Sequence, residues 1–405
     1  MRVALVSEHA NPLAAVGGVD AGGQNVHVAA LAAGLVARGH DVTVHTRRDT
    51  TSAPERVLAP EGYVVEHVPA GPPTEVPKDE LLPYMPAFAE HLERRWRSEP
   101  VDVAHSHFWM SGVASVAAGV RTGVPVLHTF HALGTVKRRH QGVRDTSPPA
   151  RIGFERRLCG QVDQVVATCN DEVAELVALG MHPDRATVIP CGVDTDAFRP
   201  VAGDGAPARG AGRPRLLVIG RLVERKGVGN VIEALAQLPG VELLVAGGPE
   251  PRFLDTDPEI ARLRALAERH AVADRVRFLG SVSRPDVPAL MASADVVVCV
   301  PWYEPFGIVP LEAMACARPV VGSAVGGLLD TVVPGRTGEL VPPRRPDLLA
   351  PVLCDLLADP ARRAAYGEAG RARVVERYRW SAVAAATEDV YAAVADRTIR
   401  TGAAR

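Results

Sequence analysis

The sequence of 405 residues has few lysines, few aromatic side chains and no long apolar run. Only Lys78, Lys137 and Lys226 contribute lysine to its 45 basic side chains, and the remainder are arginines. Arginine is therefore the default cation of this chain, so each lysine marks a position where a compact charge could be preferred over a planar fork. No stretch approaches the length of about 18 apolar residues that a membrane helix requires.

An excess of charge of either sign is also lacking. The chain carries 47 acidic and 45 basic side chains, for a formal net charge of −2. This balance gives no electrostatic reason to bind nucleic acid, and it allows at most peripheral contact with a membrane surface. Apolar and charged contents of 47% and 23% are ordinary globular values, which exclude a disordered, fibrous or coiled-coil chain.

Paired cysteines and targeting segments are missing as well. The cysteines form no CxxC pair, so neither a disulfide framework nor a zinc site is expected. The apolar run at residues 3–6 is too short for a signal peptide, which predicts a cytoplasmic protein with reduced thiols. The six cysteines are Cys159, Cys169, Cys191, Cys299, Cys316 and Cys354.

Short β-branched runs alternate with longer helical patterns along most of the chain, which predicts an α/β fold with doubly wound parallel sheets. Strands are expected at residues 2–6, 41–46, 63–68, 102–107, 125–130, 164–168 and 186–190, and again at 215–220, 241–248, 275–280, 295–300, 319–323 and 338–341. Helices are expected at residues 23–39, 226–238, 257–271, 285–293, 309–317 and through most of the last sixty residues.

A Gly-, Pro- and Ala-rich segment at residues 199–214 separates the two groups of strands and can bury little, so it is expected to be a linker. The predicted organisation is a first domain over 1–198 and a second over 215–376. Ligands of doubly wound sheets bind outside the carboxyl ends of the strands, so a cleft between two facing sheets is the expected active site.

The segment "RLLVIGRLVERKGV" predicts a strand, a short loop and the start of a helix. Arg221 lies just past the strand and Lys226 at or just before the first helical turn. Two cations beside helix N–H groups make a site for a phosphate or diphosphate, although loop cations of this kind are more often solvated surface groups.

The segment "PWYEPFGIVPLEAMA" places Glu304 on a loop and Glu312 within the first turns of a helix that begins near Val309. Backbone N–H groups around Gly307 and Ile308 would face a ligand. Because a carboxylate can accept bonds from two adjacent hydroxyls, the pattern suits a sugar nucleotide, with Glu312 on the ribose and Glu304 on the hexose. The alternative is a solvated glutamate and a second one at a helix end.

The loop "GGVDAGGQN" opens the first helix but is not GxGxxG, which disfavours a dinucleotide dehydrogenase. Gly22 and Gly23 can bring backbone N–H groups close to a phosphate, or can simply form a flexible loop with a glycine cap. Gln24 and Asn25 could bond acceptor hydroxyls or cap the helix.

Two histidine pairs lie near predicted strand ends, at 105 and 107 and at 128 and 131. No acidic or cysteine partner is spaced with them, so a zinc site is not expected. We expect some of them to be buried and hydrogen-bonded, with His131 outermost and facing the cleft. The sequence contains no GxSxG elbow and no P-loop, which argues against a serine hydrolase and a P-loop phosphotransferase.

Taken together, these patterns resemble the retaining glycosyltransferases of family four, which have the two-domain GT-B fold. Within that family the chain is most similar to the actinobacterial D-inositol-3-phosphate N-acetylglucosaminyltransferases and, more distantly, to sucrose-phosphate synthases. The motifs that carry the resemblance occur in family order: Asn11-Pro12-Leu13, "GGQN", "HSHFW" (105–109), "HALGTVK" (131–137), "GRLVERKG", "EPFG" and the tail "RYRW".

The resemblance implies a role for each matching residue. Arg221 and Lys226 would hold the donor diphosphate, helped by the backbone of Gly22 and Gly23, and His131 would lie near the reacting centre. Glu304, with Phe306, Gly307, Ile308 and Val309 beside it, would bind the donor hexose, and Glu312 would bind the ribose. The family needs no metal or other cofactor, and its last helix, here 377–405, returns to the first domain. A homodimer is left open.

The resemblance also bears on the acceptor. Asn25, Lys78 and Arg151 match the family's acceptor-phosphate residues, and Gln24 and Lys137 lie on neighbouring segments. Two hydroxyl donors of the inositol-phosphate enzymes are missing, because Phe108 replaces a tyrosine and Ala132 replaces a threonine. A hydrogen bond to a charged group contributes about 1.5–3 kcal/mol, so their loss predicts an unphosphorylated polyol or sugar acceptor.

The sequence therefore predicts a metal-independent retaining hexosyltransferase that uses a nucleotide sugar, most plainly a UDP-linked one such as UDP-GlcNAc or UDP-Glc. One alternative is a GDP-mannose-dependent enzyme with a lipid-linked or glycan acceptor, for which residues 137–144 are the candidate basic patch. Another is a glycan- or nucleotide-binding protein without turnover, which would release no nucleotide from a donor.

Overall fold

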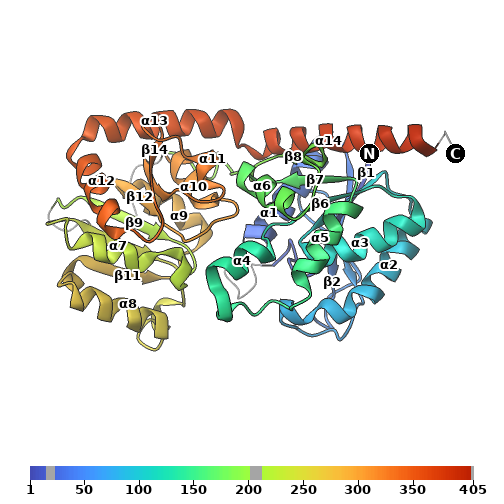
Figure 1. The fold of residues 1–405 in the computed structure, drawn as a ribbon, viewed down its shortest axis with the longest axis horizontal. Coiled ribbons are helices and arrows are strands. Elements are labelled where there is room, and N and C mark those ends of the chain that lie inside the picture. The colour runs from blue at the N-terminus through green and yellow to red at the C-terminus, as the bar shows by residue number, and fades with distance from the viewer. Residues whose placement is uncertain (15–22, 201–211, 403–405) are drawn as a thin grey trace. The chain divides into compact units, whose positions relative to one another are not determined.

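The computed structural model describes residues 1–14, 23–200 and 212–402, with side chains described as far as Arg397. The chain divides into two compact units (Figure 1). Unit 1 consists of Met1–Cys191 and Trp380–Arg405, and unit 2 consists of Gly192–Arg379. Each unit is a sheet covered by helices on both faces, and the two are described separately below.

The sheet of unit 1 has the strand order β3-β4-β2-β1-β5-β6-β7-β8 and is parallel except for the antiparallel edge strand β3. Its strands are continuous apolar runs because both faces are buried. In β1, Ala4 and Val6 pack on one face and Val3 and Leu5 on the other. The strands are β1 (Arg2–Val6), β2 (Asp41–Arg47), β3 (Arg56–Leu58), β4 (Val64–Val68), β5 (Val103–His107), β6 (Val126–Thr129), β7 (Gln164–Ala167) and β8 (Ala186–Val188).

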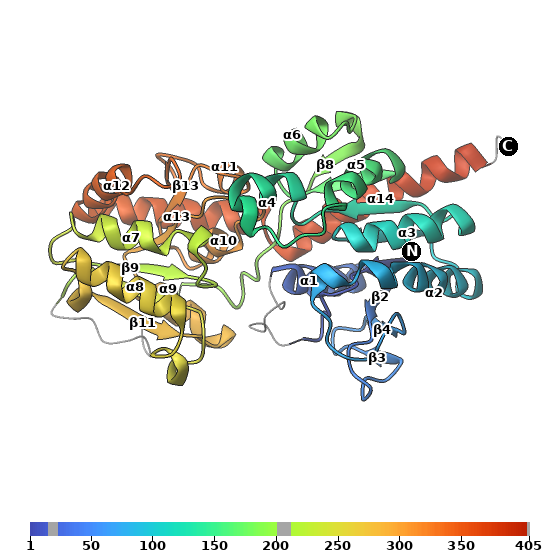
Figure 2. The ribbon, with the colours of Figure 1, turned by 60° about the horizontal axis from the view of Figure 1, so that its bottom comes forward.

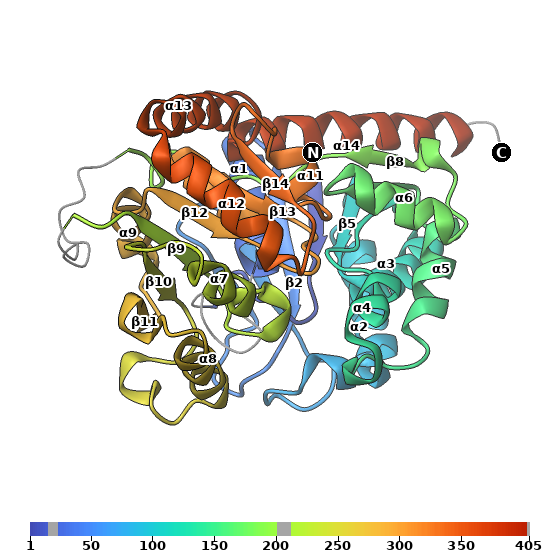
Figure 3. The ribbon, with the colours of Figure 1, turned by 60° about the vertical axis from the view of Figure 1, so that its left-hand side comes forward.

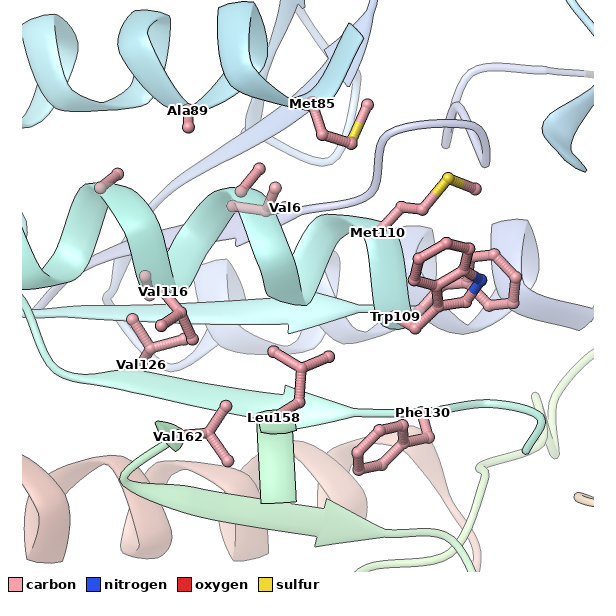
Figure 4. Close-up of a cluster of buried hydrophobic side chains, with 14 of the residues drawn as sticks. Val6, Met85, Ala89, Trp109, Met110, Val116, Val126, Phe130, Leu158 and Val162 are labelled. Carbon is pink, nitrogen blue, oxygen red and sulfur yellow. The ribbon is translucent and has the colours of Figure 1, made fainter. Parts of the chain in front are cut away.

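Helices cover both faces of this sheet. One core lies under α2 (Met85–Ser98), α3 (Trp109–Thr122) and α5 (Arg151–Gln161), and Figure 4 shows Trp109, Met110 and Phe130 within it. The other lies under α1 (Gly23–Ala37) and α14 (Trp380–Gly402). Helices α4 (Gly134–Gln141) and α6 (Asn170–Ala178), both labelled in Figure 2, come after β6 and β7 in the chain.

The sheet of unit 2 has the order β11-β10-β9-β12-β13-β14 and is parallel throughout. One face packs against α7, α8 and α12, which Figure 3 labels, and the other against α9, α10 and α13. The strands are β9 (Arg215–Ile219), β10 (Glu242–Ala246), β11 (Val276–Gly280), β12 (Val296–Cys299), β13 (Val320–Ser323) and β14 (Gly338–Val341). The helices are α7 (Val228–Leu235), α8 (Pro258–Arg269), α9 (Val287–Ala292), α10 (Ile308–Ala315), α11 (Leu328–Thr331), α12 (Pro346–Ala358) and α13 (Pro360–Arg377).

The predicted strands all occur, within two residues at each end. Strand β3, a three-residue edge strand, is not predicted from the sequence, and neither are the individual helices between residues 85 and 178. The chain passes to unit 2 after Cys191, seven residues before the predicted boundary at 198, because Val193 and Phe198 pack into the core of unit 2. Most of the predicted linker, residues 201–211, lies outside the described residues.

The C-terminal helix α14 packs against α1 within unit 1. Gly34 makes this close approach feasible, because a Cβ there would lie 2.8 Å from the Cβ of Ala384. Tyr391 and Val394 of α14 are fully buried in the same core. Within residues 1–14, 23–200 and 212–402, no helix combines the length and apolarity needed to cross a membrane.

Candidate active site

Lys226 lies at the carboxyl edge of the second sheet, between β9 and α7. A short 3-10 turn, Glu224–Lys226, leads into Gly227, which caps α7 with a φ of +76°. A Cβ at Gly227 would lie 2.0 Å from the carbonyl oxygen of Val300, just past the end of β12. Only glycine allows this approach, and it holds Lys226 beside the loop that carries Glu304.

Lys226 and Glu304 form an ion pair through Nζ and Oε2, which joins two patterns that are 78 residues apart in the sequence. Their side chains are 24% and 16% exposed. Burial alone would raise the pKa of Glu304, but Lys226, assisted by Arg225 and Arg221, lowers it below the usual range. Glu304 is therefore ionised at neutral pH, and Lys226 keeps one side open to solvent.

Glu312 is buried in α10 and pairs with a residue that the sequence analysis misses. Helix α10 begins at Ile308, one residue before the predicted start, and Gly307 caps it with a φ of +73°. Oε1 of Glu312 lies 2.5 Å from Nη1 of Arg284, whose guanidinium also stacks 4.6 Å from the ring centroid of Phe198. Burial raises the pKa of Glu312 despite this partner. Glu312 therefore has a cationic partner at one of its two carboxylate oxygens.

A glycine pair after β13 supports the loop of Glu304. The N–H of Gly327 donates to the carbonyl oxygen of Glu304 at 2.9 Å. A Cβ at Gly326 would lie 2.1 Å from that oxygen, and one at Gly327 would lie 2.6 Å from the carbonyl oxygen of Phe306. No role is predicted for this segment from the sequence, although two adjacent glycines shortly after a predicted strand were the available signal.

The other predicted donor residues lie close by in the chain. Arg221 follows β9 and is exposed, and its charge helps to lower the pKa of Glu304. Phe306 is half-buried on the loop before α10, and Ile308 and Val309 form the first turn of that helix. Unit 2 thus gathers every predicted donor residue except Gly22 and Gly23 around the ends of β9 and β12.

The predicted histidines cluster at the carboxyl edge of the first sheet, and His27 of α1 joins them. His107 Nδ1 and His131 Nε2 share a hydrogen bond of 2.9 Å. His105 bonds Tyr391 and Thr129, both at 2.8 Å. Burial lowers the pKa of His27 to about 4 and of His128 to about 3, and holds the others well below the ordinary value. The cluster is neutral at physiological pH.

His131 is buried at 3% exposure, yet it is the outermost of the four predicted histidines, because the other three are 0% exposed. Its backbone has a φ of +61°, and its ring bonds His107. Phe108, at the end of the neighbouring strand, also has a positive φ of +77°. Such conformations cost about 1–3 kcal/mol in residues other than glycine and are concentrated at functional sites.

Gln24 and Asn25 bond the loops around them instead of capping α1. Gln24 donates to Ser7 Oγ at 3.1 Å and to the carbonyl oxygen of His107 at 3.3 Å. Asn25 is buried and donates to the carbonyl oxygen of Asn11 at 2.9 Å. Gly23 begins α1, whereas Gly22 lies outside the described residues.

The cationic side chains of unit 1 that are predicted to bind the acceptor substrate lie among neighbouring residues of the same unit. Arg151, 3% exposed, donates to Glu155 at 2.7 Å and to the carbonyl oxygen of Ala132 at 2.5 Å, and it lies 5.0 Å from the ring centroid of Phe108. Lys137 lies 2.8 Å from Ser147 and 3.1 Å from Asp145. Lys78 is half-buried in the short turn Lys78–Glu80.

A metal site is not found among the residues that the structure describes, where no group of three or more His, Cys, Asp and Glu side chains could hold an ion. In the histidine cluster the sulfur of Cys191 lies 3.4 Å from Nδ1 of His27, but among the described residues no third ligand completes a group with them. Unit 2 instead has cations and carboxylates next to backbone segments whose close approach depends on glycines.

Comparison with known proteins connects this arrangement to an enzyme family. The family description Glycosyltransferase Family 4 matches residues 21–197, and Glycosyl transferases group 1 matches residues 206–373. The chain is 37% identical to D-inositol 3-phosphate glycosyltransferase 2 of Catenulispora acidiphila, over 96% of this chain and 94% of the relative. It is 38% identical to the D-inositol 3-phosphate glycosyltransferase of Xylanimonas cellulosilytica, over 98% and 97%.

Solved structures agree with these matches. The sucrose-phosphate synthase of Thermosynechococcus elongatus superimposes with a TM-score of 0.88 and 34% identity, covering 97% of this chain and 98% of that one. Anabaena HepE in complex with UDP and glucose, 20% identical over 97% of this chain and 100% of its own, has a TM-score of 0.74 and shows the shared GT-B fold. Because the family matches cover both units and the relatives align over nearly their whole length, the chain belongs to glycosyltransferase family 4.

Proposed function

We propose that this glycosyltransferase moves a hexose from a UDP-linked sugar to a hydroxyl of a small polyol or sugar, with retention of anomeric configuration and without a metal. The observation that carries the proposal is the Lys226–Glu304 pair beside Arg221 at the carboxyl edge of the second sheet. It offers cations for a diphosphate and an ionised carboxylate for sugar hydroxyls at one place.

In the proposed reaction, the bond between the anomeric carbon and the diphosphate oxygen breaks while the acceptor oxygen bonds the same face of the sugar. The acceptor proton passes to the departing phosphate oxygen, so the enzyme needs no separate base. Lys226 and Arg221 would stabilise the negative charge that develops on the leaving group. Glu304 is ion-paired with Lys226. A paired carboxylate is better suited to accept hydrogen bonds from sugar hydroxyls than to act as the covalent nucleophile of a retaining glycosidase.

UDP is the proposed nucleotide because the related HepE has been solved with UDP-glucose. Titration calorimetry of UDP against the wild type tests the assignment. Replacing Glu312 with alanine should weaken UDP binding about 10- to 100-fold, since it removes hydrogen bonds to the ribose worth roughly 1.5–3 kcal/mol. Glu259→Ala, on the exposed pair with Arg262, is the matched control. No binding of UDP to the wild type would refute the nucleotide assignment.

The proposed acceptor is uncharged. Arg151 is occupied by Glu155 and Lys137 by Asp145, so each cation already has a carboxylate partner. Phe108 and Ala132 supply no hydroxyl donors. A phosphate here would have to compete with these carboxylates for the same cations.

An acceptor screen with myo-inositol, D-inositol 3-phosphate and glucose, read by nucleotide release, tests this choice. Turnover with myo-inositol or glucose supports an uncharged acceptor. Turnover with D-inositol 3-phosphate alone would contradict it. The anomeric configuration of the product tests retention. It is measured from the proton–proton coupling constant of the anomeric proton by NMR.

A further inference from the structure

His105 and His107 have no role in the proposed function, although both side chains are fully buried. They lie two residues apart on β5, so both rings point to the same face of the sheet. Their ring centroids are 4.3 Å apart, with an interplanar angle of 35°. The orientation of one ring therefore restricts that of the other.

Hydrogen bonds determine which nitrogen of His105 carries a proton. The hydroxyl of Thr129 donates to the carbonyl oxygen of Val166 at 2.9 Å, which uses its single proton. Nε2 of His105, 2.8 Å from the same hydroxyl oxygen, must therefore be a donor. Burial holds the pKa of His105 well below the ordinary value, so the ring is neutral and its Nδ1 is an acceptor.

The donor to Nδ1 of His105 is a side chain of the C-terminal helix α14. The hydroxyl of Tyr391 lies 2.8 Å from this nitrogen, although the two residues are 286 positions apart in the sequence. Tyr391 is fully buried, and its ring meets that of His105 edge-on at a centroid distance of 5.7 Å. Without the hydroxyl, Nδ1 would be a buried polar atom that has lost its partner, which is costly. Helix α14 thus fixes both the tautomer and the orientation of His105.

His107 connects His105 to His131. Nδ1 of His107 lies 2.9 Å from Nε2 of His131, and the two rings are inclined by 30°. The ring of His27 packs against both, at centroid distances of 5.6 and 5.1 Å. Because the left-handed backbone of His131 persists only where its surroundings over-determine it, the packing of these rings contributes to holding it.

We propose that Tyr391 is a positioning residue for sugar transfer, whose hydroxyl fixes His105 and, through His107, the ring of His131. The inference rests on the proposed function and on the place of His131 near the reacting centre, which the family resemblance implies. It makes the packing of α14 a requirement for turnover as well as for the fold of unit 1.

Replacing Tyr391 with phenylalanine tests the proposal, because it removes the hydroxyl and keeps the ring that packs in the core. Tyr63→Phe, in the same core, is the matched control. We expect kcat to fall about tenfold in Tyr391→Phe, with both KM values within about twofold of the wild type, since the change misplaces a group at the reacting centre. Rates are compared at a temperature at which circular dichroism shows each variant to be folded. An unchanged kcat, or an equal fall in Tyr63→Phe, would overturn the proposal.

The ¹⁵N chemical shifts of the histidine rings give a second readout in the full-length protein. Signals of His105 and His131 are assigned through their loss in His105→Asn and His131→Asn. We expect the wild type to have a protonated Nε2 and an unprotonated Nδ1 in His105. Tyr391→Phe should shift the ring signals of both histidines, whereas Tyr63→Phe should not. A proton on Nδ1 of His105 in the wild type, or signals of His131 that do not respond to Tyr391→Phe, would overturn the proposal.

A double-mutant cycle tests the path through His107. Because His107→Ala interrupts that path, Tyr391→Phe should lower kcat no further in this background. A second fall of about tenfold would show that Tyr391 acts independently of His107 and would overturn the proposal. If His107→Ala does not fold, the ring signals of His131 decide. All rates use whichever nucleotide sugar the wild type turns over, so absence of UDP binding would refute the proposed nucleotide and leave this test valid.

Discussion

The carboxyl edges of the two sheets hold their polar side chains in different ways. In unit 2 the central groups are charged and partly open to solvent, as in the Lys226–Glu304 pair. In unit 1 the central groups are neutral, buried histidines bonded to one another and to hydroxyls. The cations that unit 1 does carry, Arg151 and Lys137, each meet a carboxylate of their own unit.

This difference follows from what each edge has to recognise under the proposed function. A diphosphate carries charge that must be matched, and the match is worth most where cations are fixed before the ligand arrives. A polyol carries no charge, and neutral donors and acceptors held in fixed orientations can distinguish its hydroxyls. The predictions below test this contrast, from the largest expected effect to the smallest.

Replacing Lys226 with alanine should have the largest effect, because it removes the cation assigned to the diphosphate and leaves Glu304 without its partner. By analogy with other single transition-state donors, we expect kcat/KM for the donor to fall about 10²- to 10³-fold, measured by nucleotide release. Lys226→Arg should recover little of this activity, because the planar guanidinium of arginine does not fit where the compact ammonium group of lysine does. Arg264→Ala on α8 is the control. Activity near the wild type in Lys226→Ala would remove the main support for the charged edge.

The glutamates of unit 2 should respond to pH with opposite signs. The depressed pKa of Glu304 stabilises the fold above the ordinary pKa near 4.5, and this is lost as the pH falls. Glu304→Gln should therefore cost about 1–3 kcal/mol at pH 7.5, with a smaller penalty in acid.

The pKa of Glu312 is raised, so its contribution is present below 4.5 and is lost as the pH rises through the raised value. Glu312→Gln should be neutral or stabilising at pH 7.5, and the gain should disappear in acid. Urea unfolding at several pH values measures both variants. The same pH trend in both would contradict the assigned environments.

The buried histidines should make unit 1 sensitive to acid. With a pKa of about 4 in the fold, His27 stabilises the protein above the ordinary value of 6.5, and this contribution is lost as the pH falls from 6.5 toward 4. The difference in unfolding free energy between His27→Gln and the wild type should therefore depend on pH. It should shift in favour of the variant by about 2 kcal/mol between pH 7.5 and pH 5. The exposed His182→Gln should show no such gain. Parallel pH profiles for the wild type and His27→Gln would show that burial of this ring is not what limits acid stability.

The remaining lysines should give the smallest effects. Lys78→Arg is expected to change the acceptor KM only a few-fold, and Lys137→Arg less, because arginine can still bond Asp145 and Ser147. Initial rates over a range of acceptor concentrations measure both. If either variant lost as much activity as Lys226→Ala, a charged side chain of unit 1 would matter as much as those of unit 2. The contrast between the two units would then not hold.

Much of the fold could be predicted because its strands are apolar runs bounded by glycine, proline or charge. The three residues of β3 could not, since such a short edge strand has no periodicity. Glu304, Glu312, Arg221 and Lys226 could be placed at strand ends, and parallel topology then brings them to one edge.

The partners of these residues were harder to predict. The bonds of Glu312 to Arg284, of His107 to His131 and of Glu8 to Ser111 join separate segments and leave no local pattern. The positive φ of His131 could not be predicted from the sequence either, because only a few per cent of residues other than glycine have one. Sequence patterns therefore located the functional segments, whereas packing decided which side chains are free to meet a ligand.

The division of the chain has a consequence for its synthesis. Unit 1 includes Trp380–Arg405, so its core is built from both ends of the polypeptide. Translation makes α14 only after unit 2, so α1 stays uncovered and Tyr391 cannot reach His105 until residues 380–402 have been made. Unit 2, contiguous from Gly192 to Arg379, can finish folding first. The nascent chain thus acquires the Lys226–Glu304 pair before the core of unit 1 is closed, and loss of α14 alone would leave unit 1 exposed to chaperones and proteases.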